Sequence, residues 1–294
     1  MSNLKSIKRK IVSIKNTRQI TRAMKMVAGV KFKKNQAAMN AFRPYSETYD
    51  GVIKNISRNS VLYSHPFFKK NSGNSGSADS GGTGIIIIST DRGLCGSFNI
   101  NLFKLFFEEL KAQGLGSDRI KLYILGKKGT DFFKRHNYFV KFTANFSEGN
   151  VGTDLSKTLA MAISADFTRG EINEFYIVSN NYISTLHQRA AIEKILPLDS
   201  FDENKRSGGY LVEPVSYEDE IIDKVFKDYI QTKIYFKILE SFAGEQASRM
   251  NAMDNATRNA GKLINKLTTI YNKARQAAVT LEILDIINGA SAIE

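Results

Sequence analysis

The sequence predicts an α/β protein with long helical extensions, in which an antiparallel coiled coil of N- and C-terminal helices accompanies an α/β domain. Three observations support this fold class. All four prolines lie between positions 44 and 214, so both ends can form long helices. Both ends repeat apolar residues at helical spacing, and the region between them alternates strands with helices. The 294 residues suffice for one large or two ordinary domains.

Residues 3–43 are predicted to form the first long helix. A helix of about 40 residues would be roughly 60 Å long. Its apolar stripe steps by three or four residues through Leu4, Ile7, Ile11 and Ile14, then continues through Thr17, Thr21, Met24 and Ala28.

The same N-terminal segment is strongly basic. Residues 1–46 contain 12 Lys or Arg and no acid, so they hold almost all of the net charge of +13. A solvated face is the simplest interpretation of a charge run, but repulsion between so many like charges costs stability. The segment therefore predicts an acidic partner, which could be nucleic acid, an anionic membrane surface or an acidic protein.

The C-terminal helix is predicted to be longer. It should begin after Pro214 with Ser216 as N-cap, carry acids in its first turn and stop at Gly289. About 70 residues of helix would reach roughly 105 Å. Because it exceeds the first helix, part of its heptad seam must lack an intramolecular partner. The predicted seam is Met253, Ala256, Ala260, Leu263, Leu267, Ile270, Ala274, Ala277, Leu281 and Leu284.

The middle of the chain predicts a Rossmann-like α/β domain with a mostly parallel sheet. Strands are expected at 85–89, 121–126, 138–142, 174–180 and 190–198, and helices at 99–112, 127–136 and 154–166. Residues 199–215 should form a loop and a short strand. The expected domains are 1–70 (first helix and connector), 71–215 (α/β domain with a flexible Gly/Ser segment at 71–84) and 216–294 (second long helix).

No catalytic, cofactor or metal site is predicted. The stretch "IIIISTDRGLCGSF" has the strand, turn and helix layout of a phosphate loop, but it lacks GxxxxGK[ST] and GxGxxG, and "GTG" at 82–84 precedes its strand. A tight turn at Gly93 and Gly96 is the favoured interpretation, with Cys95 as a small buried side chain rather than a nucleophile. The three histidines, His65, His136 and His187, lack metal-ligand spacing.

Several segments resemble the gamma subunit of F-type ATP synthase. They are "KSIKRKIVSIKNTRQITRAMKMVAGVKFKK", "FRPYSETY", "STDRGLCGSFNINLF" and "IYNKARQAAVTLEILDIINGASA", in this order over essentially the whole chain. The most specific is the terminal pattern formed by Val279, Thr280, Glu282, Asp285, Gly289, Ala290 and Ala292.

The resemblance implies a central rotor shaft without an active site of its own. One copy would stand in a ring of alternating alpha and beta subunits, bind the epsilon subunit and rest on the membrane c ring, coupling proton-driven rotation to ATP synthesis at beta and regulating ATPase activity and proton flow. It would bind no nucleic acid and meet the membrane only through the complex. It also implies beta contacts at Arg22, Met24, Lys25, Arg275 and Gln276.

Two other classes compete with this interpretation, and the second fails on the residues. A nucleic-acid-binding coiled-coil protein would use the basic helix, although no known nucleic-acid module accompanies it. An α/β enzyme with helical arms would need catalytic groups that the sequence lacks. The expected location is the cytoplasmic side of a bacterial inner membrane, with the matrix side of the mitochondrial inner membrane as the alternative that Met1 disfavours. With Cys95 alone, a regulatory dithiol of the chloroplast type is excluded.

Overall fold

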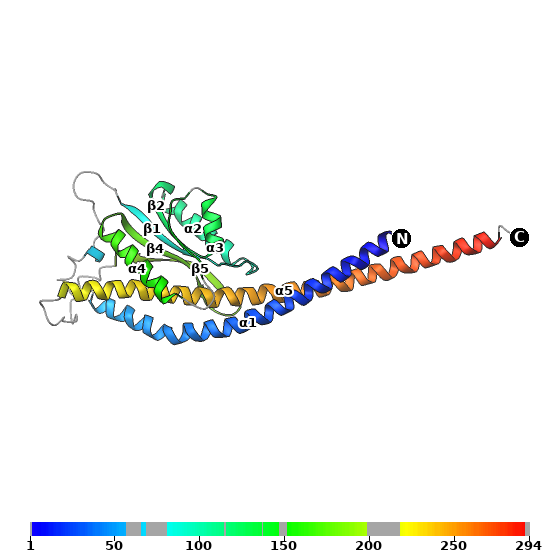
Figure 1. Ribbon diagram of the computed structural model, residues 1–294, viewed down its shortest axis with the longest axis horizontal. Coiled ribbons are helices and arrows are strands. Elements are labelled where there is room, and N and C mark those ends of the chain that lie inside the picture. Colours follow the sequence, from blue (N-terminus) through cyan, green and yellow to red (C-terminus); the bar gives the residue numbers. More distant parts are fainter. Residues whose placement is uncertain are drawn as a thin grey trace. The chain divides into compact units, whose positions relative to one another are not determined.

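The computed structural model describes residues 2–56, 66–68, 81–114, 116–136, 138–146, 152–198 and 218–291. They divide into two compact units. The coil unit comprises 1–30 and 249–294, and the sheet unit comprises 31–248. Two long helices, α1 (Ser2–Ile56) and α5 (Glu218–Ser291), contribute residues to both units (Figure 1). The three domains expected from the sequence follow chain order, whereas the compact units group segments from opposite ends of the chain.

The sheet unit is built on a five-stranded, mostly parallel sheet, as predicted. The strand order is β3-β2-β1-β4-β5, and only β5 runs antiparallel to its neighbour. The strands are β1 (Gly82–Ile88), β2 (Ile120–Leu125), β3 (Val140–Ala144), β4 (Ile172–Tyr182) and β5 (Gln188–Leu196). The "GTG" at 82–84, expected ahead of its strand, lies inside β1.

Helices cover both faces of this sheet (Figure 1). Ile85 and Ile87 of β1 point to the face covered by α2 (Phe98–Gln113) and α3 (Lys127–Lys134). Ile86 and Ile88 point to the other face, where α4 (Thr153–Thr168) and α5 pack. Because successive side chains of a strand alternate between faces, the unbroken isoleucine run supplies both cores.

Helix α1 is longer than predicted, because Pro44 does not end it. Proline lacks the N–H that would bond the carbonyl one turn earlier, so the helix loses one hydrogen bond there. That carbonyl belongs to Asn40, an exposed residue, so water can satisfy it. Aromatic contacts to α5 hold the helix in place on both sides of Pro44. Phe42 packs edge-on against Tyr235 with 4.7 Å between ring centroids, and Tyr49 stacks on Tyr229.

Helix α5 differs from the prediction at its C-terminal end. Gly289 was expected to stop the helix, but it continues to Ser291. A glycine inside a helix costs about 1 kcal/mol relative to alanine, which is too little to force an end where the neighbours favour helix. The expected start at Pro214 and Ser216, the short strand within 199–215, and residues 71–80 of the Gly/Ser segment lie outside the described residues.

In the coil unit, the two helices pair antiparallel, as predicted. Thr21 of α1 meets Thr257 of α5, with 2.8 Å between the hydroxyl oxygens. One turn further along α1, Lys25 binds Asp254, one turn back along α5. Each step along α1 is thus matched by an equal step back along α5. Small side chains allow close approach, and a Cβ added at Gly29 would lie 3.6 Å from Met250 Sδ.

The predicted seam of α5 is wrong at alternate positions. Leu263 and Ile270 are 44% and 42% exposed, whereas Ile264 is 8% exposed. Met253 and Ile264 are buried, and the half-buried residues on the same line are Thr257, Ala260, Leu267, Tyr271, Ala274 and Ala278. Of these eight, the predicted seam contained Met253, Ala260, Leu267 and Ala274. Both lines fit a heptad, and leucine and isoleucine pointed to the wrong one. The hydrophobicity of these residues serves a face that the partner helix does not cover.

Candidate partner-binding surface

The outer face of α1 in the coil unit is both basic and apolar. Arg18 and Arg22 are exposed, as are five further Lys or Arg residues nearer the N-terminus. Large apolar side chains lie among them, with Ile20, Met26 and Val27 between 57% and 60% exposed and Val30 72% exposed. A contiguous exposed apolar surface edged by charge marks a protein interaction site. The basic charge indicates an acidic partner.

The three predicted beta contacts on α1 differ in exposure. Arg22 is exposed and Met24 is half-buried. Lys25 Nζ lies 2.5 Å from Asp254 Oδ1, with 44% of the Lys25 side chain exposed. Asp254 also binds Arg258 at 3.1 Å. The hydrogen bond from Lys25, with Arg258 nearby, lowers the pKa of Asp254. Lys25 therefore has an acidic partner within its own chain, which the sequence analysis did not anticipate.

The end of α5 exposes apolar side chains around most of its circumference. Leu281, Ile283, Leu284, Ile286 and Ile287 are between 47% and 71% exposed. At about 100° per residue these positions spread over more than half of the circumference, with the exposed Glu282 on the remaining side. So broad an exposed apolar surface marks an interaction site, and none of the described residues covers it.

The predicted residues of the C-terminal motif lie on this same end of α5. Arg275, Gln276, Thr280 and Glu282 are exposed, and the Thr280 hydroxyl donates to the Gln276 carbonyl oxygen at 2.9 Å. Asp285, Gly289 and Ala290 belong to the helix, and the structure describes only their backbone. The role of these residues remains a prediction.

In the sheet unit, the place where α/β folds usually bind ligands is filled. Such folds bind at the carboxyl ends of the strands where the strand order reverses, here between β1 and β4. The loop after β1 is covered by α5, whose Ser248 hydroxyl donates to the Cys95 carbonyl oxygen at 2.7 Å. A Cβ added at Gly244 would lie 3.2 Å from Phe98. Cys95 itself is 3% exposed, which confirms it as a small buried side chain.

The motif "STD" at 89–91 caps helix α3 instead of holding a ligand. The backbone N–H groups of Lys127 and Gly129 donate to Asp91 Oδ1 and to Ser89 Oγ, both at 2.9 Å. The Lys128 N–H donates to a backbone oxygen of the same motif. These are the orphan donors that make a helix N-terminus attractive to a phosphate. With all three satisfied, α3 offers no anion site.

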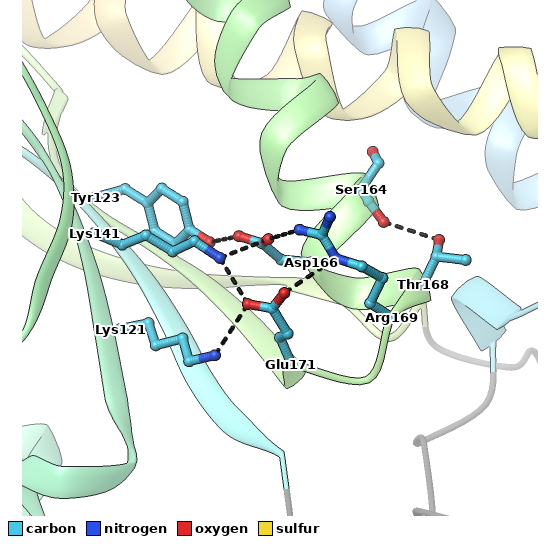
Figure 2. A network of polar contacts seen from close by, with 8 residues as sticks. All are labelled: Lys121, Tyr123, Lys141, Ser164, Asp166, Thr168, Arg169 and Glu171. Atoms are coloured by element: carbon cyan, nitrogen blue, oxygen red, sulfur yellow. Dashed lines mark hydrogen bonds and ion pairs between the residues drawn. The ribbon is translucent and has the colours of Figure 1, made fainter.

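A polar network closes the opposite edge of the sheet (Figure 2). Asp166 at the end of α4 binds Lys141 of β3 at 2.6 Å, Arg169 at 2.7 Å and the Tyr123 hydroxyl. Burial alone raises the pKa of Asp166, but its three donors outweigh burial and lower it. Beside it, Glu171 binds Lys121, Lys141 and Arg169, and the two lysines lower its pKa to about 2.

Every charge in this network has an opposite partner, which fits a structural role. Among the described residues no group of three or more His, Cys, Asp or Glu could hold a metal ion. None of the helices, as far as the chain is described, has the length and apolarity needed to cross a membrane.

The coil unit exposes apolar and basic faces, and α5 covers the usual ligand-binding crevice of the sheet unit. These features indicate a protein that acts by binding other proteins. A profile described as ATP synthase matches residues 3–293. The "ATP synthase gamma chain" of Glaesserella parasuis serovar 5 is 38% identical, and that of Histophilus somni strain 129Pt is also 38% identical, each over the full length of both chains. The chain belongs to the family of ATP synthase gamma chains.

Solved structures show the same architecture. A chain from the central stalk and c-ring structure of Tetrahymena thermophila mitochondrial ATP synthase is 26% identical, with a TM-score of 0.60, and the match covers 81% of this chain and 99% of that one. A chain from Euglena gracilis mitochondrial ATP synthase, in rotational state 3, has a TM-score of 0.67 at 18% identity over 99% of this chain and 95% of that one. The second likeness concerns the fold.

Proposed function

We propose that this chain is the central rotor shaft of a proton-translocating F-type ATP synthase. It couples rotation of a membrane c ring to conformational cycling and ATP synthesis at the beta subunits. The observation that carries the proposal is the apolar surface around the end of α5, where Leu281, Ile286 and their neighbours are more exposed than a free helix tolerates. A ring of subunits that encloses this helix end would bury them from all sides.

The shaft acts by unequal binding. A ligand or subunit shifts a conformational equilibrium only as far as its affinities for the two states differ. The asymmetric pair α1 and α5 presents a different surface to each beta subunit, so each rotation step changes which beta conformation is favoured. We assign contacts with an acidic loop of beta to Arg22, Met24 and Lys25, and further beta contacts to Arg275 and Gln276. Lys25 would share its charge between that loop and Asp254.

The chain is a non-catalytic subunit in this proposal. Its switch-point crevice is covered by α5, and the N-terminal amides of α3 are occupied by its own residues. One copy per complex would contact alpha and beta, the epsilon subunit and the c ring. It would be peripheral on the cytoplasmic side of a bacterial inner membrane, because its 38% identical relatives are bacterial.

Reconstitution tests this function. Alpha and beta subunits are mixed with and without this chain, and native mass and ATP hydrolysis are measured. We expect a complex with three alpha, three beta and one copy of this chain, and hydrolysis that depends on it. The alternative of a nucleic-acid-binding coil predicts that the chain stays free and binds DNA with a steep salt dependence. That result would overturn the proposal.

A further inference from the structure

Helix α5 meets the sheet through charged side chains as well as apolar ones. An apolar row fills the core on one side of the helix, with Phe226, Ile230, Ile234 and Ile238 all fully buried. Beside that row, α5 carries Lys233, Lys237 and Glu240, whose side chains are only 12%, 9% and 9% exposed. Charges at this depth lose their hydration, so they need a reason beyond solubility.

Two turns of α5 are tied to one carboxylate of β5. Lys233 Nζ lies 3.3 Å from Glu193 Oε1, and Lys237 Nζ lies 3.1 Å from Glu193 Oε2. The two lysines are four residues apart, so they stand one helical turn apart on the same face. Both oxygens of a single carboxylate thus hold two successive turns of the helix.

The same helix face is also tied to β4. Lys237 Nζ lies 2.9 Å from Asn181 Oδ1, and the Tyr182 backbone N–H donates to Glu240 Oε1 at 3.1 Å. Lys237 and Glu240 also bind each other at 3.2 Å. We name the α5 clamp as Lys233, Lys237 and Glu240 of α5 with Asn181, Tyr182 and Glu193 of the sheet.

The clamp extends to α1. Lys233 Nζ lies 2.8 Å from Asp50 Oδ1, so a single ammonium group joins α1, α5 and β5. Burial lowers the pKa of Lys233, but Asp50 and Glu193 outweigh burial and raise it, so the group stays charged. Tyr182 adds a second bridge, because its hydroxyl accepts from Gln36 of α1 at 3.2 Å.

Apolar packing and polar contacts resist different movements. Apolar contact is non-directional, so the isoleucine row opposes separation of α5 from the sheet more than a small slide or turn about the helix axis. Hydrogen bonds and ion pairs weaken steeply when distance and angle change. Replacing buried ion pairs by apolar residues is often neutral or stabilising, so stability alone does not explain them. The need to fix the position of α5 on the sheet does explain them.

We infer that the α5 clamp is a positioning device that locks the shaft helix to the sheet against rotation and sliding, so that torque passes between the sheet and α5. The inference rests on the proposed rotor function and names residues that serve it. Torque about a helix axis acts in the direction that apolar packing resists least. The four polar contacts from α5 to β4 and β5 act in that direction.

The test is the torsional stiffness of the reconstituted complex of alpha, beta and this chain. The alpha–beta ring is fixed to a surface, the complex is stalled without rotation, and a bead is attached to a cysteine introduced by Asp131→Cys at an exposed position of α3. The native Cys95 is buried and does not compete for the label. The variance of the bead angle measures the compliance between α5 and the sheet.

Lys237→Met keeps the apolar stem and removes two of the four contacts to the sheet. If the contacts contribute equally, the angular variance rises by up to about twofold, since mean-square displacement is inversely proportional to stiffness. The matched control is Lys141→Met, which breaks the buried pair with Asp166 but contacts no residue of α5 in the described interactions. It should lower the melting temperature and leave the variance unchanged.

Each outcome decides one point. Higher variance in Lys237→Met but not in Lys141→Met supports the clamp. If the angular variance of Lys237→Met does not exceed that of Lys141→Met, while hydrolysis and rotation are intact, the clamp is overturned and the rotor function stands. If Lys237→Met does not fold, the milder Glu193→Gln is measured by the same criteria, since it keeps an oxygen for one lysine. Failure of the unmodified chain to assemble with alpha and beta would instead overturn the rotor function.

Discussion

Replacing Asp166 by asparagine should destabilise the chain through the network of Figure 2. The Asp166 side chain is 2% exposed and accepts from Lys141, Arg169 and Tyr123. Asparagine has nearly the same shape but no charge, so the change isolates electrostatics from packing. It also points an amide N–H₂ group toward donors that need an acceptor.

The size of the effect follows from the exposure of the partners. Arg169 is 61% exposed, so solvent screens its pair with Asp166 to a contribution of about 0–1 kcal/mol. Lys141 is 28% exposed, and Tyr123 is fully buried. Hydrogen bonds to a charged acceptor contribute about 1.5–3 kcal/mol each, and the amide oxygen recovers part of one. Asp166→Asn should therefore lower the free energy of unfolding by about 2–4 kcal/mol at pH 7.

The loss should depend on pH in a defined direction. The folded-state pKa of Asp166 is lowered, so the carboxylate stabilises the fold above its unfolded pKa of about 3.9. That stability is lost as pH falls through the folded pKa. The gap between wild type and Asp166→Asn should thus be largest above about pH 5 and narrow below about pH 4.

Urea unfolding followed by near-UV circular dichroism of the tyrosines measures both effects. The matched control is Glu171→Gln in the same network. Its side chain is 37% exposed, so it should lose less stability than Asp166→Asn. A gap below about 1 kcal/mol at pH 7, or a gap that does not narrow in acid, would refute the assignment of a buried, ionised Asp166.

Three further predictions concern single sites. Ser164 carries a buried hydroxyl without a hydrogen-bond partner, so Ser164→Ala should leave the urea midpoint unchanged or raise stability by up to about 1 kcal/mol, and a clear loss would indicate a hidden partner. In the coil unit, Thr21→Val and Thr257→Val should each lower the free energy of unfolding, and the double variant should lose less than the sum of the two single losses. The expected coupling is about 0.5–1.5 kcal/mol in a thermal-unfolding cycle, and additive losses would mean that the 2.8 Å contact between the hydroxyls is not stabilising. Cys95 is 3% exposed and should react with a thiol reagent at the rate of unfolding, whereas prompt labelling in native buffer would contradict its burial.

Local periodicity and turn chemistry determined the elements of this protein. The run Ile85–Ile88 identified β1, and the eight helices and strands predicted between residues 85 and 198 occur within a few residues of their expected positions. The antiparallel pairing of the terminal helices was also predictable, because both ends lack proline and carry heptads. These features depend on residues close together in the sequence, where spacing alone carries the information.

Residue identity misled the prediction where local preference and tertiary packing disagree. Pro44 suggested a helix end, yet aromatic contacts beyond it, such as Tyr49 with Tyr229, hold α1 against α5. On α5, Leu263 and Ile270 suggested the seam, but they are exposed and Ile264 is buried. The hydrophobicity of a side chain indicates that it will be buried, but not whether the surface that covers it belongs to the same chain.

Charge could be counted from the sequence, but charge partners could not be assigned. The basic strip on residues 1–46 was evident, whereas the pairing of Lys25 with Asp254 required the antiparallel register. The α5 clamp joins Lys237 to Glu193 across two elements, and nothing in the spacing of either residue marks it.

The sequence by itself thus determined the helices, the strands, the family and the absence of a known catalytic motif. Only the tertiary structure decided which helix face stays exposed, which charges are buried together and that α5 fills the ligand crevice. The physical reason is the separation in sequence between the residues that interact. Helix and strand patterns arise from contacts between near neighbours in the chain, whereas burial and ion pairing depend on which distant segments meet.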